Sequence, residues 1–292
     1  YLYVGSGITA SDSFVTDPYV IVTNSGSLNI SLWPGNNNSE MKGLHVYGNN
    51  ATITALPDVN VRDGAGVTNH YTFIDSHVYS SYTVSHGSAV MAFTNSTFAW
   101  LYDATDRSKW KVFNFAAYSM SYAGEIDMTF SQGSVLAIDY FGYTAPSSSQ
   151  SFPLVLTFDD SEWWAGTGDA TLATSNLNVR TVSVGGGLIQ QPETGKTWRW
   201  ISPVEGPGGF VKRGAGKVFF DTQIKYHQAT ADTTTLQYTG LTDIQAGTLQ
   251  IANGAVSNIV ARALRVAGTL NAGGNSFASP VIESAGGTVA NA

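Results

Sequence analysis

The chain has 292 residues, of which 43% are hydrophobic and only 12% are charged. This apolar content is enough to bury a sizeable core, and the net charge of −7 argues against nucleic acid or an anionic membrane as a partner. No apolar run reaches the roughly 18 residues that a membrane-spanning helix needs. The chain has no cysteine, which excludes disulfide bonds.

The composition favours short strands and tight turns over helices. The chain holds 31 glycines and many serines, threonines and asparagines, which are typical of turns. No long segment repeats its apolar residues with the 3.6-residue period of a helix. We therefore expect an all-β protein with little helix.

The first predicted strands are short and lie on either side of corners rich in asparagine and glycine. Residues 20–22 and 28–32 form one such pair, and residues 44–47 and 51–56 form the next. Each strand is too short to bury a core by itself. We therefore expect these strands to stack on one another along the chain.

A repeat follows in the middle of the chain. Residues 73–76, 93–96 and 158–161 share the pattern Phe-x-Asx-Ser, residues 130–133 are a looser copy, and residues 113–114 are read as another. The steps between the phenylalanines are 20, 20, 17 and 28 residues. Residues 143–149 fall in the longest step and read as an inserted loop.

Near the C-terminus the pattern Gly-Thr-Leu/Val recurs at 247–249, 268–270 and 287–289, in steps of 21 and 19 residues. A period near 20 residues fits one coil of a β-solenoid with three short strands and three corners. Asn and Asp tolerate the left-handed backbone conformation of a corner and hydrogen-bond nearby backbone groups. The sequence therefore predicts a stack of coils with apolar side chains inside.

Residues 206–251 read as strand, glycine turn and strand. Residues 206–220 are GPGGFVKRGAGKVFF, and residues 238–251 are YTGLTDIQAGTLQI. This segment, about a sixth of the chain, resembles the passenger-associated repeat of bacterial autotransporters, with Phe210 in place of a leucine and Leu241 in place of a common glycine. The matching positions are Gly206, Gly208, Gly209, Lys212, Gly214, Gly216, Val218, Tyr238, Gly240, Thr242, Ile244, Gly247 and Leu249.

The resemblance extends to the AIDA-type adhesins and self-associating antigens. It implies a right-handed, single-stranded parallel β-helix of the pectin-lyase-like type, displayed extracellularly at the outer-membrane surface of a Gram-negative bacterium. The translocator barrel of that family is not in the chain, so we expect a passenger fragment without membrane contact. We expect one domain, 1–292, with an irregular aromatic-rich part (1–205) and a regular glycine-rich part (206–292).

The aromatic and acidic span 71–164 is the predicted binding region. Within 97–103, alternation places Phe98, Trp100 and Tyr102 on one face, outward if the small aliphatic residues face the core. The alternative is that the rings are simply core residues. The tryptophans at 198 and 200 are read as a wedge between the two parts of the chain.

Stacked outward rings and carboxylates would form a face suited to glycans or an extended polypeptide. Asp139 is expected to point outward from 135–141, and Asp127 and Asp139 to lie near the mixed-charge cluster 103–109 and the acidic cluster 159–162. The candidate ligand-binding residues are Trp100, Asp103, Asp106, Lys109, Asp127, Asp139, Asp159, Asp160, Glu162 and Trp164.

The family implies a surface adhesin, associated with virulence, that binds host glycans (glycosaminoglycans included) or a matrix protein such as fibronectin. The first alternative is self-association that drives cell aggregation and biofilm formation. The second is a polysaccharide-degrading enzyme, which needs paired carboxylates that the sequence does not assign. The histidines at 70, 77 and 86 are read as surface and corner residues, so we expect no enzyme, cofactor or metal.

Overall fold

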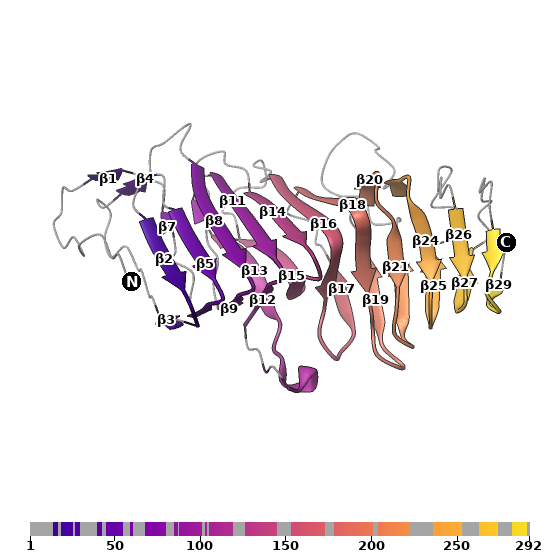
Figure 1. Ribbon diagram of the computed structural model, residues 1–292. Helices are drawn as coiled ribbons and strands as arrows, with labels where there is room; N and C mark the ends of the chain where they lie inside the picture. Colours follow the sequence, from indigo (N-terminus) through magenta and orange to yellow (C-terminus); the bar gives the residue numbers. More distant parts are fainter. Residues whose placement is uncertain are drawn as a thin grey trace.

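The computed structural model describes residues 14–16, 19–25, 27–29, 40–42, 45–54, 59–60, 68–79, 85–86, 88–100, 103, 105–118, 126–144, 153–172, 178–200, 204–221, 236–252, 263–273 and 282–290. Within this part the protein is all-β, and its helical structure is one 3-10 turn, η1 (Arg107–Lys109). The long sheets are parallel and curl as a half-barrel, so the fold is solenoid-like (Figure 1). The predicted all-β class is confirmed.

The strands lie in three rows, and each row runs along the stack in chain order (Figure 1). The first row consists of β2 (Tyr19–Thr23), β5 (His45–Asn49), β8 (Thr68–Ile74), β11 (Ser88–Thr94), β14 (Ile126–Ser131), β16 (Pro153–Trp164), β18 (Asn178–Gln190), β20 (Val204–Gly206) and β23 (Leu236–Tyr238).

The second row consists of β3 (Ser27–Asn29), β6 (Thr52–Thr54), β9 (His77–Tyr79), β12 (Thr97–Ala99), β15 (Val135–Thr144), the ends of β16 and β18, β21 (Phe210–Lys212), β24 (Leu241–Ile244), β26 (Ala263–Val266) and β28 (Ile282–Ser284). Because β16 and β18 continue around the corner, the first two rows form one sheet of 19 strands, which also includes β13 (Phe113–Tyr118).

The third row is a six-stranded sheet of β17 (Ala170–Leu172), β19 (Thr197–Trp200), β22 (Lys217–Phe220), β25 (Thr248–Ile251), β27 (Thr269–Asn271) and β29 (Thr288–Ala290). Two small parallel pairs lie apart from the rows: β1 (Phe14–Thr16) with β4 (Glu40–Lys42), and β7 (Val59–Asn60) with β10 (Ser85–His86).

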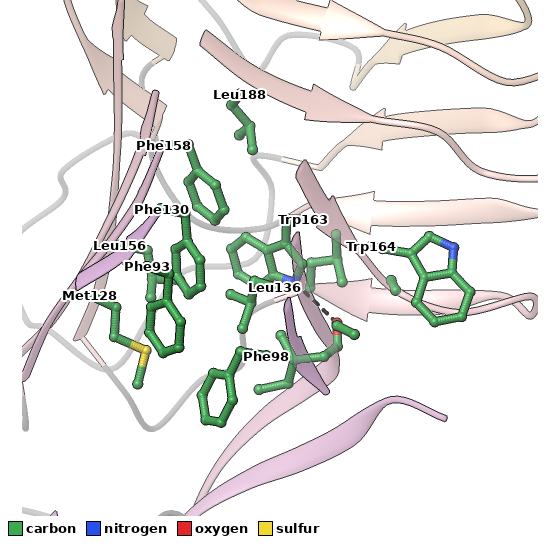
Figure 2. Close-up of a cluster of buried hydrophobic side chains, with 14 of the residues drawn as sticks. Phe93, Phe98, Met128, Phe130, Leu136, Leu156, Phe158, Trp163, Trp164 and Leu188 are labelled. Atoms are coloured by element: carbon green, nitrogen blue, oxygen red, sulfur yellow. Dashed lines mark hydrogen bonds between the residues drawn. The ribbon is translucent and has the colours of Figure 1, made fainter. Parts of the chain in front are cut away.

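An interior ladder of phenylalanine rings explains the first repeat. Phe73, Phe93, Phe130 and Phe158 occupy the same register position on β8, β11, β14 and β16. Their ring centroids follow one another at 5.1, 4.8 and 5.3 Å, and all four side chains are fully buried (Figure 2). The predicted repeat therefore marks one inward-facing column of the core.

The Asx and Ser positions of the same repeat form the corner between the first two rows. Asp75 and Asn95 have φ of 49° and 46°, and the Asn95 side-chain amide donates to the Asp75 carboxylate at 2.7 Å. The buried Ser96 hydroxyl accepts from the Ser76 backbone N–H, and Ser134 does the same for Ser96, both at 3.0 Å. Each coil thus provides hydrogen-bond partners for backbone N–H groups of its neighbour. These bonds stabilise the stack, since a backbone group without a partner inside a core costs free energy of folding.

The expected spacing of about 20 residues holds only in part of the chain. The step from one coil to the next is 18 residues at Arg265–Glu283 and 20 at Asp75–Asn95, but 37 at Thr94–Ser131. Reading Phe113 as a repeat member was wrong, since it lies on β13 and pairs with Ile138 of β15 in the second row. Surface insertions lengthen a coil without changing the register of its strands. The loop predicted at 143–149 was wrong at its start, since Tyr143 and Thr144 belong to β15, and its remaining residues, 145–149, lie outside the described residues.

The core continues into the C-terminal part through tryptophan. Trp200 is buried and lies 4.7 Å from the Trp163 ring and 6.4 Å from the Phe220 ring, measured between centroids. Trp163 donates its indole N–H to the Ile138 carbonyl at 3.0 Å, which allows a polar ring in a dry core (Figure 2). The tryptophans that were predicted to wedge the two parts of the chain against each other are therefore part of one continuous aromatic core.

The described parts of the segment 206–251, residues 206–221 and 236–251, consist of strands and turns as predicted, and several of their residues allow the coils to stack closely. A Cβ on Gly240 would lie 2.4 Å from the Gly208 carbonyl, so only glycine fits there. Lys212 points inward and is fully buried, and its ammonium donates to the carbonyls of Arg213, Gly214 and Ala246 at 2.6–3.0 Å. Burial lowers the pKa of Lys212 to about 8. These positions are scaffold residues that allow close coils.

Candidate functional site

One excursion leaves the stack between β12 and β13. We call residues 105–112, together with Trp100 and Asp103, the knob; it carries η1 and projects from the body (Figure 1). The Trp100 backbone N–H donates to the Lys111 carbonyl at 3.1 Å and closes the base of the knob. The knob is the part of the predicted binding region that leaves the regular stack.

A carboxylate organises the interior of the knob. Asp103 Oδ1 accepts from the Thr105 hydroxyl at 2.7 Å, from the Thr105 backbone N–H at 2.8 Å and from the Asp106 backbone N–H at 3.1 Å. The Trp110 indole N–H donates to the Asp103 carbonyl at 2.7 Å. Asp106 caps η1 by accepting from the Ser108 backbone N–H at 3.0 Å. The knob is therefore an ordered turn held by its own polar groups.

These contacts predict how the knob responds to acid. The hydrogen bonds from Thr105, helped by Lys109, lower the pKa of Asp103 to about 2, below its usual 3.8. A carboxylate with a depressed folded pKa stabilises the fold above its unfolded pKa and loses that contribution as the pH falls through the folded value. We expect hydrogen-exchange protection of the knob backbone, measured relative to the intrinsic exchange rate at each pH, to decrease between pH 4 and pH 2. In Asp103→Asn this pH dependence should be absent, and an equal pH dependence would contradict the role of Asp103.

Arg107 fastens the knob to a distant strand. Its guanidinium lies 2.8 Å from Glu162 Oε1 on β16, and its Cζ lies 4.9 Å from the Trp164 ring centroid and 5.1 Å from that of Trp110. The two rings meet edge to face, at 84° and 5.5 Å. The cation is thus held by two aromatic faces and one carboxylate.

Glu162 is the buried end of this contact. Its side chain is 8% exposed, and its second oxygen accepts from the Gln191 amide at 2.7 Å. Burial raises the pKa of Glu162, and Arg107 and Gln191 act in the opposite direction. Arg107 of the knob is the cation in contact with this carboxylate, and Arg213 adds a weaker Coulombic contribution, so the charge on β16 is coupled to the position of the knob.

The outer surface of the knob is open to solvent. Trp100 is 53% exposed, one of few large apolar side chains so exposed among the described residues. Thr105, Ser108, Lys109 and Lys111 are exposed around it. Lys109 lies 3.3 Å from Asp103 and 3.5 Å from Asp106, so its charge is shared between two carboxylates. The knob therefore presents an aromatic ring, hydroxyls and paired charges.

The structure brings six of the ten predicted residues together at the knob. They are Trp100, Asp103, Asp106, Lys109, Glu162 and Trp164. The described contacts do not join the other four to the knob. Asp127 is half-buried on β14 and pairs in register with Val90 and Val155.

Asp139, Asp159 and Asp160 have local structural surroundings. Asp139 is the extra residue of a bulge in β15 opposite β13, and burial raises the pKa of its carboxyl. Asp159 accepts from the Gly186 backbone N–H at 3.0 Å, and Asp160 occupies a left-handed corner with φ of 48°. These residues shape corners and a bulge.

The structure gives the orientation of two rings in the predicted region, and Phe98 follows the alternative in which the rings are core residues. Phe98 is fully buried and stacks 5.2 Å from the Phe93 ring, since Ala99 beside it is buried as well and the strand ends there. Trp164 does point away from Trp163, as alternation requires (Figure 2), but the knob covers it and leaves it 3% exposed. Tyr102, predicted to point outward, lies outside the described residues.

Sequence reasoning left Arg107, Trp110 and Gln191 out of the site. Arg107 lies inside the densest mixed-charge cluster of the sequence. That position was the available signal that its charge could pair with a buried carboxylate outside the cluster. Gln191 and Glu162 are 29 residues apart, and only the stacking of β18 on β16 brings them together.

The described residues hold no group of three or more histidine, cysteine or acidic side chains arranged to bind a metal ion. Within the same residues, no helix is long and apolar enough to cross a membrane. Comparisons with protein-family models, with curated proteins and with solved structures found no match. The function must therefore be argued from the knob itself.

Proposed function

We propose that the chain is a surface-binding protein whose knob contacts a glycan, on the scaffold of a right-handed parallel β-helix. The observation that carries the proposal is the exposed Trp100 ring on an excursion anchored by a buried ion pair. Sugars stack on exposed aromatic rings, and an ordered loop binds with a smaller entropy cost than a mobile one. In this proposal the protein is an AIDA-type autotransporter passenger and an extracellular adhesin.

Three features of the structure support the family resemblance. The parallel rows, the left-handed Asx corners and the inward Lys212 each give a structural reason for a residue pattern quoted from the sequence. The ligand favoured by the knob is a neutral or weakly charged glycan, because its cations are paired or balanced by Asp103, Asp106 and Glu162. Glycosaminoglycans and fibronectin are alternatives for the same surface.

Binding to immobilised glycans tests the proposal. We expect the parent chain to bind at least one glycan class, and Trp100→Ala to weaken that binding about fivefold or more, as loss of about 1 kcal/mol of stacking implies. Tyr19→Ala is the matched control, because Tyr19 is a comparably exposed ring (55%) on β2 in a different row. Equal affinity of the parent and Trp100→Ala would remove the knob as the binding site.

The same preparation separates the alternative functions. A parent chain that dimerises in sedimentation, with Trp100→Ala monomeric, would assign the knob to self-association. Release of reducing ends from a polysaccharide would assign an enzyme. The same binding assay with immobilised fibronectin in place of glycans distinguishes a protein ligand from a sugar ligand.

A further inference from the structure

A second site lies on the outer face of the first row, away from the knob. We propose that His45 and His70 together bind a divalent transition-metal ion, Cu²⁺ in preference to Zn²⁺, through one ring nitrogen each. This site is independent of the proposed function, so either can fail without the other.

The register of three neighbouring strands creates the site. Tyr19 on β2 pairs with His45 on β5, which pairs with His70 on β8. The strands lie side by side at the indigo end of the stack (Figure 1). The centroids of Tyr19 and His45 are 4.5 Å apart at an angle of 9°, and those of His45 and His70 are 5.0 Å apart at 12°. The two imidazoles are therefore nearly parallel neighbours.

The rings are available to solvent. His70 is exposed, His45 is half-buried between its two neighbours, and Tyr19 is 55% exposed. No hydrogen bond or ion pair within the described part of the chain engages the ring nitrogens of His45 or His70. Because the ring faces stack on one another, the edges carrying the nitrogens remain for a ligand. This arrangement favours a metal ion, which binds ring nitrogens, over a sugar, which stacks on a ring face.

The in-register positions on neighbouring strands allow bidentate binding once the two rings rotate out of their stack. A metal–imidazole bond is about 2.0–2.1 Å, so two cis ligands place their nitrogens about 3 Å apart. Rings stacked 5.0 Å apart at 12° direct their nitrogen lone pairs in parallel, so both side chains must rotate until the lone pairs converge on the metal, at roughly a right angle for cis ligands. Exposed side chains can make this rotation because no packing opposes it on the solvent side.

The surroundings determine which metal fits. In the same column His70 is followed by Val90 and then by Asp127, so no described carboxylate stands next to the pair. Two neutral imidazoles and water suit Cu²⁺, Ni²⁺ and Zn²⁺, with Cu²⁺ bound most tightly in the usual order, and offer little to Ca²⁺ or Mg²⁺.

Titration with CuCl₂ at pH 7.5, followed by electron paramagnetic resonance at one equivalent, tests the site. We expect nitrogen hyperfine structure from two imidazoles, and His45→Ala or His70→Ala to weaken Cu²⁺ binding about tenfold or more, with a one-nitrogen spectrum. His77→Ala, a half-buried histidine on β9, is the control and should leave binding unchanged. Circular dichroism checks that the variants stay folded.

Two results would overturn the inference. One is a His45→Ala/His70→Ala double variant that binds Cu²⁺ as tightly as the parent. The other is a parent spectrum that shows a single nitrogen ligand at one equivalent. His70→Asn, which keeps a polar side chain on the strand, repeats the test if an alanine variant loses its fold.

Discussion

Replacing Phe130 by alanine is expected to destabilise the fold by about 3–5 kcal/mol, among the largest effects that a single core truncation produces. Phe130 is fully buried and stacks on Phe93 at 4.8 Å and on Phe158 at 5.3 Å, so its removal opens a cavity between two coils. Denaturant titration followed by circular dichroism measures the loss.

Thr129→Ala is the matched control for this change. Thr129 lies next to Phe130 on β14 but points outward and is exposed, so its truncation should change stability by less than about 0.5 kcal/mol. Phe130→Leu fills most of the cavity and should cost less than Phe130→Ala. A Phe130→Ala variant as stable as Thr129→Ala would show that the ring ladder does not hold the coils together.

Removing Arg107 is expected to release the knob. Glu162 would remain buried without its cation, and breaking a buried pair in this way costs about 3–5 kcal/mol. Because the Arg107 side chain is 36% exposed and solvent screens part of the interaction, we expect about 2–3 kcal/mol. Arg180→Ala, which breaks the exposed pair with Glu205, should cost about 1 kcal/mol or less.

The cost of Arg107→Ala should depend on pH in a defined direction. Burial raises the pKa of Glu162 in the folded state, so the fold binds this proton more tightly than the unfolded chain does. Stability from this group therefore falls as the pH rises through the folded pKa, and losing Arg107 raises that pKa further. The difference in unfolding free energy between Arg107→Ala and the parent should widen as the pH rises through the pKa of Glu162 and narrow as the pH falls below it.

Limited trypsin digestion reads out the knob directly. Lys109 and Lys111 are cleavage sites on it, and both are exposed while the surrounding backbone is held in place. Arg107→Ala should be cut there faster than the parent, and the double variant Arg107→Ala/Glu162→Gln should recover part of the stability. Identical digestion of Arg107→Ala and the parent would show that the ion pair does not seat the knob.

The site residues that lie close together in the sequence could be predicted to meet, and those that lie far apart in the sequence could not. Asp103, Asp106 and Lys109 contact one another within seven residues, so local turn chemistry brings them together. Glu162 joins them only because the coils stack β16 beside the knob, 55 residues later than Arg107. Trp164 was named as a candidate ligand-binding residue, but the sequence had no means of detecting the segment that covers it.

The sequence by itself determined the all-β class, the stacking repeat and the corner chemistry. The Phe-x-Asx-Ser and Gly-Thr-Leu patterns record local requirements, namely an inward ring, a left-handed corner and a small residue where backbones approach, and these depend on few neighbours. Tertiary structure alone decided the coil lengths, the burial of Phe98 and Trp164, and the pairing of Arg107 with Glu162. Those features depend on which insertions fold back over the stack, and solvent exposure is set by residues that are distant in the chain.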